Sequence, residues 1–131
     1  MTKYGMSSTV TGTFEDVKGK VVAALKDQGF GILTEIDVQK VFKEKLGVDF
    51  EPYLIMGACN PGFAHQALSA DRSIGLLLPC NVVLRQNGNQ VDVNIQDPEV
   101  MFSVVEIGPH SDLARVPQEA KQRLQTALKS L

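Results

Sequence analysis

The sequence has no tryptophan, only two cysteines among 131 residues, and no excess of charge of either sign. Two cysteines cannot form a dense disulfide framework, which favours a reduced, cytoplasmic setting. Thirteen Lys and Arg against fifteen Asp and Glu give a net charge of −2, so the basic surface typical of nucleic-acid-binding proteins is missing. We therefore expect no nucleic-acid partner and no electrostatic attraction to anionic membranes.

Long apolar runs are also missing. No window approaches the roughly 18 apolar residues of a transmembrane helix, and residues 1–5 lack the apolar stretch of a secretory signal. We therefore expect no membrane association. The hydrophobic fraction of 44% and the charged fraction of 21% are ordinary for a globular protein. The length suits one domain, which we expect to span residues 1–131.

Strand-like and helix-like segments alternate along the chain. Residues 4–11 are rich in Ser and Thr and predict an edge strand. Apolar residues recur at helical spacing over residues 14–28, between a capping Thr13 and Gly29, and predict the first helix. The same reasoning predicts strands at 30–36 and 53–58, a short helix between Asp37 and Gly47, a helix over 62–70 and a final helix from Pro117.

An antiparallel hairpin is indicated between residues 80 and 95. Asn87-Gly88 is the preferred two-residue type I′ turn, and it separates an apolar run from the alternation of residues 91–95. That turn predicts the pairs Leu84–Val91, Val82–Val93 and Cys80–Ile95, with Asn81 meeting Asn94 on the other face. Pro79 cannot donate to a strand ladder, so it predicts an edge strand or a bulge.

The predicted element order is β-α-β-α-β-α-β-β-(β)-α, with the bracketed strand inside residues 99–107. This order predicts an α+β fold: one mainly antiparallel sheet with helices packed on one face. A doubly wound nucleotide-binding sheet is disfavoured, because the chain has no Gly-x-Gly-x-x-Gly motif and no P-loop. His110 follows Gly-Pro in a predicted loop and has no evident partner.

Two Cys-Asn pairs, each touching a proline, are the best candidates for a site: Cys59-Asn60-Pro61 and Pro79-Cys80-Asn81. Cys59 ends a predicted strand just before Asn60, a predicted helix N-cap. Unpaired backbone N–H groups and the helix dipole at that point favour a thiolate or an anionic ligand group. The alternative is that Cys59 is simply a small buried residue where a strand meets a helix.

Cys80 is expected on the apolar face shared by Val82 and Leu84, where a thiol packs as a small hydrophobe. If the two strands are neighbours, Cys59 and Cys80 approach each other beneath one pocket, and a disulfide then requires Cα atoms about 4.4–6.8 Å apart. His65 is either a general base for Cys59 or a surface histidine. The spacing of Cys59, His65 and Cys80 matches no zinc-finger pattern, so no metal is expected. The sequence does not identify a cofactor, so the cofactor is unknown.

The motifs Gly57-Ala58-Cys59-Asn60-Pro61-x-x-Ala64 and Ile74-Gly75-Leu76-Leu77-Leu78-Pro79-Cys80-Asn81-Val82-Val83 resemble those of domain-of-unknown-function family 302 of bacteria and archaea. The resemblance covers essentially the whole chain. It implies a small α+β domain of the TATA-binding-protein-like class that forms a homodimer. It implies no activity, and the fold class alone does not imply DNA binding.

Three functional hypotheses follow. The first is a non-enzymatic small-ligand or partner-binding domain, dimeric, whose ligand-binding residues are Cys59, Asn60, Pro61, Pro79, Cys80 and Asn81. The second is a thiol-dependent redox or sulfur-transfer activity, with Cys59 and His65 as catalytic candidates and Cys80 assisting. The third is a structural module that dimerises through sheet edges. The chain has no paired-carboxylate motif and no complete catalytic set, which favours the first hypothesis over an enzyme.

Overall fold

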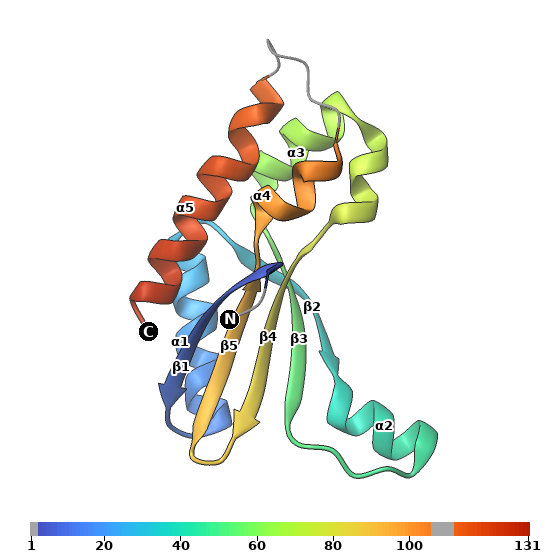
Figure 1. Cartoon of the computed structure of the whole chain (residues 1–131), viewed down its shortest axis with the longest axis vertical. Coiled ribbons are helices and arrows are strands. Elements are labelled where there is room, and N and C mark those ends of the chain that lie inside the picture. Colours follow the sequence, from blue (N-terminus) through green and yellow to red (C-terminus); the bar gives the residue numbers. More distant parts are fainter. Residues whose placement is uncertain (1–2, 106–111) are drawn as a thin grey trace.

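Figure 1 shows a computed structural model of the chain, which describes residues 3–105 and 112–131. Five strands form one antiparallel sheet in the order β1-β5-β4-β3-β2. The strands are β1 (Gly5–Thr11), β2 (Gly31–Asp37), β3 (Tyr53–Cys59), β4 (Cys80–Asn87) and β5 (Gln90–Gln96). The helices are α1 (Phe14–Asp27), α2 (Val38–Leu46), α3 (Pro61–Ala70), α4 (Pro98–Met101) and α5 (Arg115–Lys129).

The helices fall into three places around the sheet (Figure 1). Helices α1 and α5 pack together on one face of the sheet. Helices α3 and α4 lie at the end where β3 stops and β4 starts, and α2 projects from the opposite end. This arrangement confirms the predicted single-domain α+β fold with a mainly antiparallel sheet.

Side-chain caps set the predicted helix boundaries. The N-cap residue of each of three helices accepts a backbone N–H three residues on: Thr13 from Asp16, Asp37 from Lys40 and Asn60 from Phe63. Gly47 ends α2 in the left-handed conformation at φ 65°, which glycine adopts without strain. Helix α5 begins at Arg115, two residues before the predicted Pro117.

The main core lies between the sheet and helices α1 and α5. Alternate residues of the central strands point to these helices and are fully buried, because successive side chains of a strand face opposite sides. Burial of this apolar surface is the main stabilising term of the fold. The largest fully buried side chains of this core are Val17, Val21, Leu25, Met56, Val82, Leu84, Val91, Val93, Ile95 and Leu124.

The predicted hairpin is present, but its predicted register is wrong by one residue on each strand. The structure pairs Leu84 with Val93 and Val82 with Ile95, and the turn residues are Gly88 and Asn89. Gly88 has φ 64° while Asn89 has no positive φ, which fits a type II′ turn with glycine first. Because each strand shifts by one residue, the apolar face stays as predicted. The N–H of Asn81 donates to the side chain of Gln96, and Asn94 pairs with Val83.

Strand β4 is the centre of the sheet, so the edge position predicted from Pro79 is wrong. The strand begins at Cys80, directly after Pro79, and pairs with both β3 and β5. Pro79 lies outside the ladder and removes no hydrogen bond from it. The Leu78–Pro79 peptide bond is cis. The apolar residues before it form a 3₁₀ helix, Arg72–Leu77, and the irregular register lies in β2 between Ile32 and Thr34.

After β5 the chain forms α4 and then one 3₁₀ turn, Phe102–Val104. The strand predicted inside residues 99–107 does not occur in this segment up to Val105. The rest of that segment, and His110, lie outside the described residues. Across residues 3–105 and 112–131, no helix is both long and apolar enough to cross a lipid bilayer.

Candidate functional site

Pairing of β3 with β4 brings the two Cys-Asn pairs to the same end of the sheet. Ala58 pairs with Cys80 and Gly57 with Asn81, so Cys59 lies one residue beyond the pair that holds Cys80. Gly57 fits closely under Pro79: a Cβ atom at this position would lie 2.6 Å from Pro79 Cγ. Strand β3 and the start of β4 therefore pack closely at the point where the two Cys-Asn pairs are neighbours.

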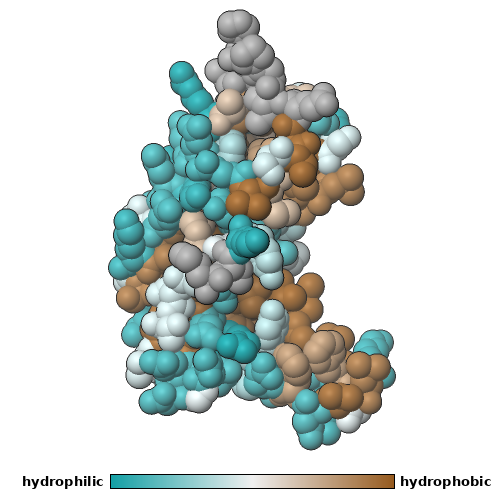
Figure 2. Space-filling view, in the orientation of Figure 1, coloured by the Kyte–Doolittle hydropathy of each residue, from teal (hydrophilic) through white to brown (hydrophobic). Residues whose placement is uncertain are grey.

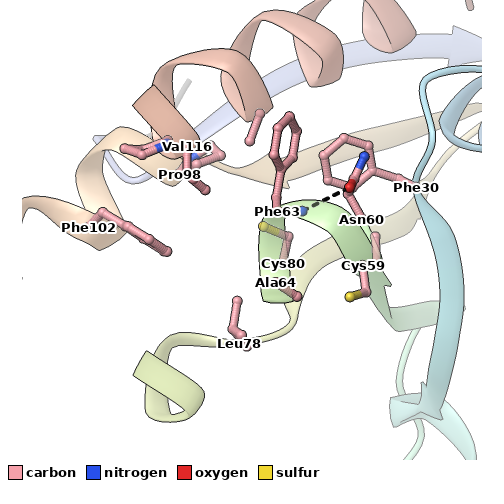
Figure 3. A pocket seen from close by; sticks show the side chains of 13 residues that line it. Phe30, Cys59, Asn60, Phe63, Ala64, Leu78, Cys80, Pro98, Phe102 and Val116 are labelled. Atoms are coloured by element: carbon pink, nitrogen blue, oxygen red, sulfur yellow. Dashed lines mark hydrogen bonds between the residues drawn. The ribbon is translucent and has the colours of Figure 1, made fainter. Parts of the chain in front are cut away.

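Asn60 starts helix α3 and orients it over this end of the sheet. Its Oδ1 atom accepts the N–H of Phe63 at 3.1 Å, and Pro61 occupies the first turn, where its missing N–H costs nothing (Figure 3). The ring of Phe63 lies 6.3 Å from that of Phe30 and 5.0 Å below the guanidinium carbon of Arg123. These contacts hold one wall of a small cavity in place.

The cavity lies between the end of the sheet, α3, α4 and α5, and has a volume of about 40 Å³. A cavity needs roughly 10–15 Å³ by this kind of measure to hold one water, so the space suits a few atoms. Cys59, Asn60 and Cys80 line it. Its other walls are apolar and include Phe30, Ala58, Phe63, Phe102, Val116 and Ala120.

The other predicted site residues lie elsewhere. Pro61 and Pro79 flank the cavity without lining it. Asn81 points to the opposite face of the sheet, where it lines a separate hollow. His65 is exposed on α3 and is not part of the cavity wall, so the structure does not pair it with Cys59.

Both cysteines are free thiols, and burial disfavours their ionised forms. Burial raises the pKa of Cys59. It also raises the pKa of Cys80 to about 11, with a smaller contribution from the charge that Cys59 carries when ionised. Burial at this position therefore opposes the stabilisation of a Cys59 thiolate that the helix start was predicted to provide. Both side chains are protonated at neutral pH, and in Figure 3 their sulfur atoms do not point at one another.

The described part of the chain contains no group of three His, Cys, Asp or Glu side chains placed to hold a metal ion together. The cysteines approach each other as the sequence suggested, and the third ligand considered with them, His65, faces solvent.

Sequence reasoning missed most of the cavity wall. Phe30, Phe102 and Val116 come from three distant parts of the chain, and each belongs to an ordinary apolar pattern in its own segment. Of these residues, Phe30 could have been predicted to be buried, because it directly follows Gly29 at the end of a helix. An apolar residue at that position often packs back on the helix. The walls become recognisable only when the sheet, α4 and α5 are assembled.

Comparisons with known proteins agree on the family. A solved structure described as "uncharacterized conserved protein DUF302 from Bacillus stearothermophilus" superposes with a TM-score of 0.84 over 98% of each chain. Its sequence identity of 24% shows a shared fold and no more. No curated protein matches the chain. The family model described as "Domain of unknown function DUF302" matches residues 6–131. On that match, the chain belongs to the DUF302 family.

Proposed function

We propose that this protein is a non-enzymatic binding domain that holds an apolar group of a small molecule in the cavity beneath α3. In this proposal Cys59, Asn60 and Cys80 contact the ligand, while Pro61 and Pro79 shape the walls. The observation that supports it is the convergence of four elements on one apolar cavity next to both Cys-Asn pairs. Apolar lining favours apolar guests over water, as in engineered cavities that bind xenon or benzene.

Binding is better supported than thiol chemistry. A redox or sulfur-transfer reaction centred on Cys59 needs a thiolate, and burial raises the pKa of that thiol. It also needs a base within hydrogen-bond reach, and His65 lies exposed outside the cavity. Binding of an apolar group does not require an ionised cysteine, because a protonated thiol behaves as a small apolar group.

Xenon tests the cavity directly, since it is a small apolar probe without hydrogen-bonding groups. Spectra correlating ¹H and ¹⁵N, recorded under increasing xenon pressure, should show saturable shifts at the amides of Ala58, Phe63 and Cys80. Ala64→Leu adds a larger side chain to the cavity wall and should abolish the shifts. Ala23→Leu makes the same change on an exposed position of α1 and should preserve them. Shifts that survive in Ala64→Leu, or that never saturate in the wild type, contradict the proposal.

Dimerisation is a second candidate function, and the β2–α2 arm favours it. This arm comprises residues 31–50; β2 is an edge strand, and helix α2 has no buried residue. Figure 2 shows brown, apolar residues along the projecting arm. Its exposed large apolar side chains are Leu33, Ile36, Val41, Leu46, Val48 and Phe50.

We propose a second copy of the chain as the occupant of this surface. The outward N–H and C=O groups of β2 pair with no strand formed by residues 3–105 or 112–131, and an exposed edge of this kind can pair with a strand of another chain. Two identical β2 strands paired antiparallel around a two-fold axis are self-complementary, so one contact satisfies both edges. The pairing also brings the two apolar arms together and removes their side chains from water.

Sedimentation equilibrium over a range of concentrations tests this interface. The wild type should reach a dimer mass, and Ile36→Lys should shift it to a monomer, because Ile36 is 50% exposed on β2 and would be buried on pairing. Leu76→Lys changes a side chain that is still more exposed, but outside the arm, and should leave the dimer intact. A wild type that stays monomeric, or a Leu76→Lys variant that dissociates equally, refutes the interface.

A further inference from the structure

The face of the sheet opposite α1 and α5 carries a hollow that the cavity beneath α3 does not reach. Its volume is about 390 Å³, within the usual range of roughly 300–1,000 Å³ for small-molecule sites. A second hollow along β1 and β5 shares Tyr53, Val83 and Asn94 with it, so the two form one trough. The main hollow is lined by Tyr4, Tyr53, Asn81, Val83, Asn94 and Gln96, among others.

Two side-chain amides in this hollow present free N–H donors. Gln96 Oε1 accepts the backbone N–H of Asn81 at 2.9 Å, which fixes the orientation of the amide and leaves its NH₂ group without a partner among the described residues. Asn94 Oδ1 accepts the hydroxyl of Ser7 at 2.5 Å, and no described residue accepts a hydrogen bond from the NH₂ group of Asn94. Asn94 and Gln96 lie two residues apart on β5 and therefore on the same face, with their Cα atoms roughly 7 Å apart.

Within the described part of the chain, no unpaired carboxylate lines the trough and competes for these donors. Asp92 is the one described carboxylate in its lining, and its oxygens accept hydrogen bonds from Arg85 at 2.7 Å, Thr9 at 3.1 Å and Asn87 at 3.3 Å. The hydrogen bond from Arg85 holds the pKa of Asp92 below its usual value, so this carboxylate stays ionised and paired. The NH₂ groups of Asn94 and Gln96 are therefore available to an acceptor from outside the chain, either solvent or a ligand.

The rest of the lining suits a flat apolar body. Val83 of the central strand β4 lines the hollow together with the aromatic side chains of Tyr4 and Tyr53, and Tyr4 is 67% exposed. The hydroxyl groups of both tyrosines and the side-chain amide of Asn81 have no hydrogen-bond partner among the described residues, so they can adapt to a ligand. Neutral donors beside apolar and aromatic surface are a typical combination in small-molecule sites.

We propose that this hollow binds a planar aromatic or conjugated carboxylate. The amides of Asn94 and Gln96 donate to its carboxylate oxygens, and its ring lies on Val83 between Tyr4 and Tyr53. A carboxylate suits these donors because a hydrogen bond to an ionised acceptor is stronger than one to a neutral acceptor. This site is separate from the cavity of the proposed function, and the two proposals can be tested independently of each other.

Benzoate and benzamidine form a matched pair of probes. Both are flat six-membered rings with a planar substituent, but benzoate offers two acceptor oxygens and benzamidine offers only N–H donors. Titration of the ¹⁵N-labelled protein with benzoate should give saturable shifts at the side-chain NH₂ signals of Asn94 and Gln96. Benzamidine should leave both signals in place. Equal responses to the two probes, or no saturable response to benzoate, overturn the proposal.

Gln96→Glu converts the same position from donor to acceptor. The variant keeps an oxygen for the N–H of Asn81 and replaces the free NH₂ group by a second, charged oxygen. Benzoate affinity should fall by about tenfold or more, the loss expected for one hydrogen bond to a charged group, and benzamidine should begin to bind. Gln122→Glu adds the same charge on an exposed position of α5 and should leave benzoate affinity unchanged.

An equal loss in both variants would mean that net charge alone sets the affinity, and would refute the site. The xenon experiment keeps the two proposals apart, because saturating benzoate should not alter the xenon shifts of Ala58, Phe63 and Cys80.

Discussion

At the scale of single residues, Gly57 decides how closely β3, β2 and the chain at Pro79 approach one another. Its φ is not positive, so its backbone conformation is open to any residue. The constraint is space: a Cβ atom there would collide with Thr34 Oγ1 and lie 2.6 Å from Pro79 Cγ. Pro79 is a rigid ring at the entrance of the central strand, so it cannot turn aside as a flexible side chain does.

Gly57→Ala should therefore lower the free energy of unfolding by about 1–3 kcal/mol, the usual cost of overpacking. Urea unfolding followed by circular dichroism measures it. Gly31→Ala is a matched control, because Gly31 also lies in a strand and a Cβ atom there meets nothing within 4 Å. If the two variants lose the same stability, the close contact at Gly57 is not the cause.

At the scale of elements, α2 differs from the other long helices because it packs lightly on the domain, through contacts such as that between the rings of Phe42 and Phe50. It buries no residue, and its ion pair between Lys43 and Asp49 is exposed and worth little. The side chain of Asp37 accepts the N–H of Lys40 at 3.0 Å, and Gly47 closes the other end. Helix α5, by contrast, buries six residues along one side and is held by the core.

Asp37→Ala should loosen α2 without unfolding the domain. Loss of an N-cap costs about 0.5–2 kcal/mol, and in α2 we expect that cost to appear locally. Hydrogen exchange followed by NMR should show amides of residues 38–46 exchanging roughly fivefold to tenfold faster, with α5 unchanged. Asp37→Asn retains the capping oxygen and should exchange like the wild type. Faster exchange across both helices would contradict a local effect.

At the scale of the whole molecule, Cys80 links stability to pH. In the unfolded chain its thiol ionises near pH 9, whereas in the folded protein burial raises its pKa to about 11. Between these values the folded state holds a proton that the unfolded state has lost. Rising pH therefore favours the unfolded state, so the contribution of this thiol is complete below pH 9 and is lost as pH approaches 11.

Urea unfolding at several pH values should show a free energy of unfolding that falls above about pH 9, by at most about 1.4 kcal/mol per pH unit from Cys80. Cys80→Ala should be less steep over the same range, because it removes the titrating group. Cys59→Ala should keep most of the slope, since Cys80 remains buried. Identical slopes in the wild type and Cys80→Ala would show that other groups control the pH dependence.

Local patterns were enough to predict most elements of the molecule. The caps Thr13, Asp37 and Asn60 act within three residues of themselves, so they mark helix starts in the sequence as they do in the structure. The apolar face of the hairpin was predicted for a similar reason, since alternation is visible in the sequence. Its register was not, because Asn87-Gly88 and Gly88-Asn89 both make acceptable two-residue turns, and pairing with β1 and β3 adds constraints that no local pattern contains.

Local sequence patterns were enough to predict the type and the limits of most elements and to single out the two Cys-Asn pairs. The assembled fold was needed to show that β4 is central, that Cys80 faces a cavity while Asn81 faces a hollow on the other side, and that burial raises the pKa of both thiols. Capping and periodicity depend on neighbours along the chain. Strand order, burial and the pKa values that follow from burial depend on neighbours in space, such as Phe102 and Val116, which come from far along the sequence.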